Sequence, residues 1–305
     1  MRNHIRVGTR GSQLALIQAE LVVGMLKRTT EEIRCEVVPI RTSGDRPRES
    51  ESTTIRDKSV FTKEIEDALL AEKIDLAVHS MKDMTTEQPQ GLLIGAIPLR
   101  ENPRDVLISR TKKKLQALQG GAKIGTSSSR RIAQLLAARN DFEIIEMHGN
   151  VDTRLKKLEK GDCDAIVLAA AGLIRLGLEK HATEFLSTEI MLPAVGQGAL
   201  AIECRETDSE IQAMLTKVDD RQSRSAVEAE RAFARRLGAD CHTPIAAYAK
   251  ADSQKLTIDG MVAAATGRML LRGRLIGNAT DSEKVGVELA ESLLNKGAEA
   301  ILEAA

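Results

Sequence analysis

The feature that most constrains the fold is a strand–turn–helix pattern that occurs twice. A short apolar run, Ile5–Val7, leads into a Gly-Thr-Arg-Gly-Ser turn, and apolar residues then recur at steps of three or four. The same pattern returns at 123–136, where Gly125-Thr126 is followed by three serines and a second helical periodicity. Small polar residues before an apolar periodic run are typical of helix N-termini, so both segments predict a strand that turns directly into a helix.

The rest of each half follows the same order. An apolar strand pattern at 37–40 corresponds to one at 143–146, and both end near a glycine. A helix that begins near Thr62 leads into a strand at 74–78, and a helix that begins near Asp152 leads into a strand at 164–168. α/β proteins in general share some of this pattern, but three matches in one order favour two related α/β lobes.

Changes in pattern along the chain predict three domains. Residues 98–104 form a polar, proline-flanked linker, and the strand expected at 199–203 is interpreted as returning to the first lobe. After residue 220 we expect a helix at 226–237, three strands near 245–249, 256–262 and 269–276, and one final helix at 283–303. The prediction is a first lobe over 1–98 and 199–216, a second lobe over 104–192, and an α+β third domain over 220–305 with a three-stranded antiparallel sheet.

Charge and composition exclude several classes of partner. Lys plus Arg and Asp plus Glu both number 44, so the net charge is zero, and the chain has four Phe, one Tyr and no Trp. A nucleic-acid binder normally has a basic excess or stacking aromatics, so we expect no nucleic-acid partner. No run of eighteen apolar residues occurs, and the first twelve residues are too polar to form the core of a signal peptide. We therefore expect no membrane partner, no secretion signal and a cytoplasmic location.

Arginines at the two predicted helix N-termini indicate an anion site. Arg10 follows the first strand, and Arg130 and Arg131 begin the second helix. A cation there opposes the helix dipole unless an anion is bound nearby, and guanidinium groups bind carboxylates and phosphates in a bidentate way. The alternative is that these arginines form ordinary surface ion pairs. A phosphate loop of the GxxxxGK[ST] type is absent from the sequence.

Two further residues could carry chemistry. Asp83 lies just past a predicted strand, close to Ser80 and Lys82, where α/β sheets hold their ligands, although it could instead cap a helix. Cys241 lies in a polar loop beside His242, whereas the other three cysteines lie in apolar surroundings. No CxxC pair and no paired-histidine motif occurs, so we expect no metal site.

Five strings then resemble one family, in the family's order. They are His79–Asp83, Gly125–Arg131, Gly149–Leu155, Leu192–Gly198 and Cys241 with Pro244-Ile245, and the resemblance runs from about Arg6 to the C-terminus. The chain resembles the porphobilinogen deaminase (hydroxymethylbilane synthase) family. The resemblance implies two lobes similar to periplasmic binding proteins that flank a cleft, a third domain that carries the cofactor cysteine, and a monomer.

The resemblance also implies an activity. Members of this family condense four porphobilinogen molecules head to tail onto a dipyrromethane cofactor, release ammonia at each step, and then hydrolyse off hydroxymethylbilane. Asp83 matches the catalytic aspartate and Cys241 the thioether anchor of the cofactor. The cofactor-binding positions are Lys82, Ser80, Thr126, Ser128, Arg130, Arg131 and Arg154. The substrate-binding positions, for porphobilinogen and the growing pyrrole chain, are Arg10, Ser12, His148, Arg175, Gln197, Lys58 and Phe61.

The sequence departs from the family pattern at a few positions. His148 stands where the family has arginine, Ser129 where it has leucine, and residues 56–59 lack the usual glycines. These departures motivate an alternative function, a non-catalytic two-lobe binder of an anionic small molecule. Cys241 argues against that alternative, because a simple binder has no need of a cysteine in this loop. A nucleic-acid-binding regulator is a weaker third reading.

Overall fold

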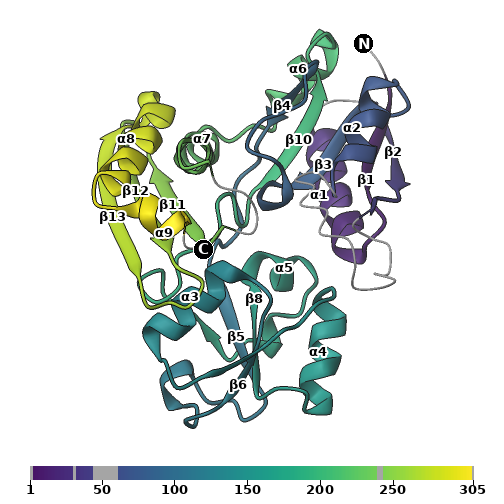
Figure 1. The fold of residues 1–305 in the computed structure, drawn as a ribbon. Helices are drawn as coiled ribbons and strands as arrows, with labels where there is room; N and C mark the ends of the chain where they lie inside the picture. Colours follow the sequence, from purple (N-terminus) through teal and green to yellow (C-terminus); the bar gives the residue numbers. More distant parts are fainter. Residues whose placement is uncertain (1–2, 30–31, 44–60, 239–242, 304–305) are drawn as a thin grey trace. The chain divides into compact units, whose positions relative to one another are not determined.

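A computed structural model describes residues 3–29, 32–43, 61–238 and 243–303 (Figure 1). The chain divides into two compact units. Unit 1 comprises Met1–Arg100 and Ala199–Arg224, and unit 2 comprises Glu101–Gly198 and Ser225–Ala305. Unit 2 therefore holds both the predicted second lobe and the predicted third domain. None of the described helices is both long enough and apolar enough to cross a membrane.

Unit 1 is built on a mixed sheet of five strands in the order β2-β1-β3-β10-β4. β1 runs parallel to β2 and β3, whereas β10 runs antiparallel to β3 and β4. α1 and α6 pack on one face through Val22, Leu26 and Ile211, and α2 packs on the other through Ile65 and Leu69. The strands are β1 His4–Arg10, β2 Arg34–Ile40, β3 Leu76–Ser80, β4 Leu92–Ala96 and β10 Leu200–Arg205; the helices are α1 Gln13–Thr29, α2 Lys63–Leu70, the 3-10 turn η2 Met81–Asp83 and α6 Ser209–Leu215.

Unit 2 contains a second sheet with the same plan, in the order β7-β6-β8-β5-β9. β6 is parallel to β7 and β8, and β5 is antiparallel to β8 and β9. The central pairing is equivalent in the two sheets, because Gly8 lies opposite Ala77 and Gly125 lies opposite Ile166. The elements are β5 Asp105–Ser109, β6 Lys123–Gly125, β7 Glu143–Ile145, β8 Ala165–Ala169 and β9 Glu184–Phe185, with η3 Leu115–Ala117, α3 Ser129–Ala138, α4 Val151–Lys160, α5 Ala170–Arg175 and η4 Glu179–His181. The prediction of two related α/β lobes is confirmed.

A three-stranded antiparallel sheet, β11-β12-β13, completes unit 2, as the sequence predicted. Its helices pack on one face around Phe233 and Leu289, both of which are buried. The bounds are β11 Ile245–Ala251, β12 Lys255–Ala263, β13 Leu270–Asn278, α7 Arg221–Arg236, η5 Ala279–Asp281, α8 Ser282–Leu294 and α9 Ala298–Glu303.

Two sequence predictions were wrong in detail. The final helix is not continuous: α8 and α9 are separated at Gly297, whose φ of 94° lies in the left-handed region and ends the first helix. The strand predicted at 74–78 is β3 at 76–80, because Asp75 is engaged outside the strand, where its carboxylate accepts from the backbone and side chain of Arg6. This shift brings the end of β3 closer to Asp83.

Candidate functional site

The carboxyl end of β3 presents the predicted catalytic aspartate. β3 is buried up to Val78 and His79, and the chain then makes the single turn η2, Met81–Asp83. The Met81 amide donates to the carbonyl of Ala199 at 3.1 Å, and its side chain is buried. Because Met81 holds the turn against the unit, Lys82 is left exposed and Asp83 half-buried.

The neighbouring strand β1 brings its own polar residues to the same edge of the sheet. β1 and β3 are parallel, so their carboxyl ends lie at one edge. Arg10 ends β1, and its guanidinium lies 4.2 Å from the centre of the Phe61 ring. Ser12 accepts from the Ala15 amide with its hydroxyl at 3.4 Å, at the start of α1. Ser80 exchanges hydrogen bonds with the Gln18 side chain of that helix. Unit 1 thus gathers Arg10, Ser12, Ser80, Lys82 and Asp83.

The equivalent edge in unit 2 contains a buried Arg–Asp–Arg triad. Arg130 donates to one carboxylate oxygen of Asp105 at 2.8 Å, and Arg131 donates twice to the other, at 3.0 and 2.6 Å. Burial alone would raise the pKa of Asp105, but the charges of Arg130 and Arg131 outweigh it and lower that pKa to about 2. Both arginines also donate to backbone carbonyls, those of Leu192 and Val167. Much of the donor capacity of these two predicted cofactor ligands is therefore used inside unit 2.

Sequence reasoning missed Asp105. Its only signal is an acidic residue at the start of the apolar run Val106–Ile108, in a strand that is wholly buried. Gln197, predicted to bind substrate, belongs to the same network, because its amide nitrogen donates to the Pro103 carbonyl at 2.6 Å and to Asp105 at 3.2 Å. Thr126 is also buried, and its hydroxyl accepts from the amide of Ser128. The roles predicted for these residues toward cofactor and substrate stay predictions.

Two other predicted arginines have no acidic partner of this kind in the part of the chain that the structure describes. Arg154, on α4, donates to the Gly149 carbonyl at 2.8 Å, and Arg175, at the end of α5, donates to the Gly198 carbonyl at 2.7 Å. Burial, together with the charge of Arg131, lowers the pKa of Arg154 to about 10. Burial also lowers the pKa of Arg175 to about 10, against the attraction of Glu101. Within the described part of the chain, neither forms a salt bridge.

This donor set fits a ligand that bears several carboxylates. A partly desolvated guanidinium without a carboxylate is electrostatically costly, and an anionic ligand offsets that cost. Dipyrromethane carries carboxylate side chains, so Arg154 and Arg175 suit it in charge and in hydrogen-bonding capacity. His148 differs from them: it is exposed, and its Nε2 lies 2.7 Å from a carboxylate oxygen of Glu146. Lys58 and Cys241 lie outside the described residues.

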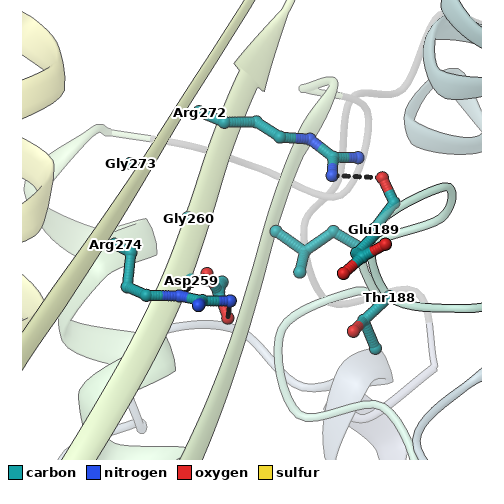
Figure 2. Close-up of a pocket in the computed structure, with 8 residues that line it drawn as sticks. Thr188, Glu189, Asp259, Gly260, Arg272, Gly273 and Arg274 are labelled. Carbon is teal, nitrogen blue, oxygen red and sulfur yellow. Dashed lines mark hydrogen bonds and ion pairs between the residues drawn. The ribbon is translucent and has the colours of Figure 1, made fainter.

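A separate small pocket in unit 2 shares no residue with these positions. It has a volume of about 70 Å³ and lies between the Thr188–Leu192 segment and strands β12 and β13 (Figure 2). Two arginines and two acidic residues line it: Arg274 pairs with Asp259, and Arg272 donates to the backbone carbonyl of Glu189. Among the residues that the structure describes, no group of three His, Cys, Asp or Glu side chains could hold a metal ion.

Comparison with known proteins now decides the family. Residues 5–213 match the family model described as "Porphobilinogen deaminase, dipyromethane cofactor binding domain", and residues 225–295 match "Porphobilinogen deaminase, C-terminal domain". The chain belongs to the porphobilinogen deaminase family. The resemblance expected from the five sequence strings is therefore confirmed, and the matched first domain is the one that binds the dipyrromethane cofactor.

Relatives of this family match along the whole chain. A porphobilinogen deaminase of Pelotomaculum thermopropionicum is 48% identical over 305 residues and covers 100% of this chain and 98% of its own. One of Bacillus subtilis is 47% identical and covers 99% and 96%. Among solved structures, the periplasmic VFT2 domain of Bordetella pertussis BvgS matches 71% of this chain and 86% of its own at 14% identity, with a TM-score of 0.44. An ancestral arginine-binding protein matches 72% and 91% at 18% identity, with a TM-score of 0.40.

Proposed function

We propose that this chain is a transferase that condenses four porphobilinogen molecules head to tail, with release of ammonia, and then releases hydroxymethylbilane by hydrolysis. Each condensation extends a chain that begins at a dipyrromethane group bound through a thioether to Cys241. The observation that carries the proposal is a pair of partly desolvated arginines, Arg154 and Arg175, that form no salt bridge among the described residues of a member of this family. Each added pyrrole brings an acetate and a propionate, so the ligand is strongly anionic.

Asp83 is the residue proposed to act on the reacting atoms. When ammonia leaves, positive charge develops on the substrate, and a carboxylate held close to it stabilises that charge. As the carboxylic acid, the same group can pass its proton to the departing amine, and the carboxylate that this leaves can accept a proton from the coupled pyrrole. Bound dipyrromethane supplies the pyrrole position to which the first substrate is joined. The turn at the end of β3 supports this role, because it leaves Asp83 half-buried rather than enclosed, next to the exposed Lys82 in the chain.

The remaining polar residues are proposed to bind carboxylates. Arg10, Ser12 and Ser80 lie at the edge of the unit 1 sheet that carries Asp83, and Thr126, Ser128 and Arg131 lie at the equivalent edge in unit 2. The zero net charge is compatible with this, because the positive charge is concentrated locally.

We further propose that the enzyme is a cytoplasmic monomer without a nucleic-acid partner. Size-exclusion chromatography with light scattering tests the oligomeric state.

The decisive experiment is the intact mass of the purified protein, compared with that of Cys241→Ser and followed by peptide mapping. We expect an adduct of two pyrrole units on the peptide that contains Cys241, and none in the variant. A Cys241 that stays unmodified after incubation with porphobilinogen would overturn the proposal and favour the non-catalytic binder of anions.

Turnover tests the role of Asp83. In Asp83→Ala we expect at least a hundredfold slower ammonia release with unchanged folding, because both charge stabilisation and proton transfer are lost. Glu87→Gln, an exposed residue in the following loop, is the matched control and should retain full activity. Normal ammonia release by Asp83→Ala would remove the catalytic assignment.

A further inference from the structure

A buried imidazole–carboxylate contact lies immediately before the turn that carries Asp83. In the antiparallel pairing of β3 with β10, His79 lies opposite Ala201 and Glu203 lies opposite Ala77. The side chains of His79 and Glu203 therefore share one face of the sheet as diagonal neighbours. Nε2 of His79 lies 3.3 Å from Oε2 of Glu203, and the two side chains are 3% and 0% exposed.

The polar atoms of this contact are poorly satisfied. Among the described residues, the two carboxylate oxygens of Glu203 and Nε2 of His79 have no hydrogen-bond partner. The two groups are therefore close to each other but not aligned as a hydrogen bond. A fully buried carboxylate without donors is strongly disfavoured in its charged form unless a cation or a proton accompanies it. The contact therefore lacks the donors that normally accompany a buried carboxylate.

A third titratable group reaches the same face from α2. Ile65 and Leu69 of α2 pack with Ala77 of β3, and this packing brings Glu66 over the sheet at 6% exposure. Burial raises the pKa of Glu66 and the charge of Glu203 adds to that rise, while Thr62 and His79 act in the opposite direction. Two carboxyl groups and one imidazole thus share one buried region.

The other charged groups on the packed elements are engaged elsewhere. Glu64 of α2 accepts from the Ser43 amide, and Asp67 is exposed. Arg205 of β10 donates to the carbonyls of Leu69 and Ile74 and binds Asp208. Asp75, just before β3, pairs with Arg6. In the described residues, then, the structure shows no lysine or arginine paired with Glu66 or Glu203.

From this geometry we infer that His79 and Glu203 are positioning residues for the turn that carries Asp83, and that their cluster with Glu66 holds at least one additional proton at neutral pH. The inference rests on the proposed role of Asp83. β3 ends one residue after His79, and the turn is attached to β10 by the bond from the Met81 amide to the Ala199 carbonyl. The contact between His79 and Glu203 fixes β3 against β10 next to that bond. With both carboxyls ionised beside a neutral imidazole, the core would carry two uncompensated negative charges, and one additional proton in the cluster removes one of them.

The proton content is measured by unfolding. The number of protons released on unfolding at pH 7, obtained from the pH dependence of the unfolding free energy, is compared among wild type, Glu66→Gln and the exposed neighbour Asp67→Asn. We expect wild type and Asp67→Asn to release equal numbers, and Glu66→Gln to release about one proton fewer, because the folded chain holds protons that the unfolded chain loses. Equal release by all three proteins would overturn the proton-holding cluster.

The positioning role is measured by a mutant cycle on turnover. In His79→Gln and in Glu203→Gln one buried partner loses its counterpart, so we expect kcat to fall at least tenfold with KM changed less than twofold, and the pH profile of kcat to shift. The double variant places two neutral amides in contact, and we expect it to recover at least threefold relative to the lower single variant. His4→Gln, on the exposed part of β1, is the control. Additive losses, or single variants with unchanged kcat and pH profile, would refute the positioning role.

The catalytic role of Asp83 and the positioning role of His79 and Glu203 are tested by different outcomes. If Asp83→Ala retains turnover, the catalytic assignment falls, while the proton count still tests the cluster. If Asp83→Ala is inactive but the His79 and Glu203 variants behave as the control, only the positioning inference falls. Should a single variant not fold, Glu66→Gln still tests the proton content, and its kcat–pH profile tests the effect on the turn.

Discussion

Arginine has two distinct environments in the second lobe, and the difference lies in where its counter-charge comes from. Arg130 and Arg131 share the carboxylate of Asp105, which is fully buried, so half of their combined charge is compensated inside the chain. Among the described residues, Arg154 and Arg175 donate to backbone carbonyls alone, and both have lowered pKa values of about 10. Among the described residues, the second pair leaves its whole charge for a ligand to compensate, whereas Arg130 and Arg131 leave one positive charge between them, although all four arginines look alike in sequence.

Arg154→Gln is predicted to separate binding from stability. Because Arg154 has no carboxylate partner among the described residues, its removal should leave the unfolding free energy of the cofactor-free Cys241→Ser protein unchanged or higher. A charge-assisted hydrogen bond to a ligand contributes roughly 1.5–3 kcal/mol, so affinity for pyrrole carboxylates should fall at least about tenfold. Calorimetric titration and urea unfolding measure both quantities. Lys156→Gln, exposed on the same helix, should change neither; equal ligand affinity in the two variants would contradict the binding role.

Asp105 predicts a window of acid sensitivity. Its pKa is lowered to about 2 in the folded chain, against roughly 3.9 when unfolded. A carboxyl group with a lowered pKa stabilises the fold above the unfolded value, and this stability is lost as the pH falls from about 4 to about 2, to the extent of about 2.5 kcal/mol. In Asp105→Asn, the unfolding free energy should no longer show this fall between about pH 4 and about pH 2. At pH 7 it should be about 3–5 kcal/mol lower than in wild type, since the variant leaves buried guanidinium groups without their carboxylate. Urea unfolding across this pH range checks it, with exposed Asp162→Asn as the control; an unchanged acid slope in Asp105→Asn would contradict the triad.

At the scale of elements, the sequence predicted best what depends on local pattern. The strand–turn–helix units at Gly8 and Gly125 and the three antiparallel strands follow from periodicity and turn residues, and all are present. The break at Gly297 was missed because apolar spacing continues across it. Asp105 and the buried pair of His79 and Glu203 were missed for a different reason. Their role depends on which strands lie side by side, and periodicity indicates burial without identifying the partner.

Gly198, two residues before β10, occupies a position where the backbone conformation and a close neighbour both favour glycine. Its φ is 91°, and a Cβ at this position would overlap the carbonyl oxygen of Glu101. Gly177 has φ of 67° but open space around it. We therefore expect Gly177→Ala to cost roughly 1 kcal/mol from backbone conformation alone. Gly198→Ala should cost roughly 2–3 kcal/mol more, because backbone atoms must move. Thermal or urea unfolding of the two variants compares them, and equal losses would show that the close approach to Glu101 is relaxed without cost.

At the scale of the whole molecule, the third sheet shares a compact unit with the second lobe. Ala133 of α3 and Leu192 pack with Met261 and Ala263 of β12 in one apolar cluster. Arg272 of β13 adds a polar contact, donating to the Gln134 side chain at 2.8 Å and to the Glu189 carbonyl (Figure 2). α3 also carries Arg130 and Arg131 in its first turn. The third sheet therefore contacts the helix that contributes both arginines of the buried triad with Asp105.

This arrangement predicts that the third sheet and the second lobe unfold together. Arg272→Ala removes two hydrogen bonds from a charged group at a partly solvated contact, so we expect the unfolding free energy of unit 2 to fall by roughly 1–2 kcal/mol. Arg274→Ala, two residues along β13, removes only an exposed ion pair with Asp259 within the sheet and should cost at most about 1 kcal/mol. Hydrogen exchange gives the sharper test. In wild type and Arg274→Ala the most protected amides of β12 and α3 should open with equal free energies, whereas in Arg272→Ala those of β12 should open more easily than those of α3. If the amides of β12 and α3 keep equal free energies in Arg272→Ala, the apolar cluster around Met261 alone couples the sheet to the lobe.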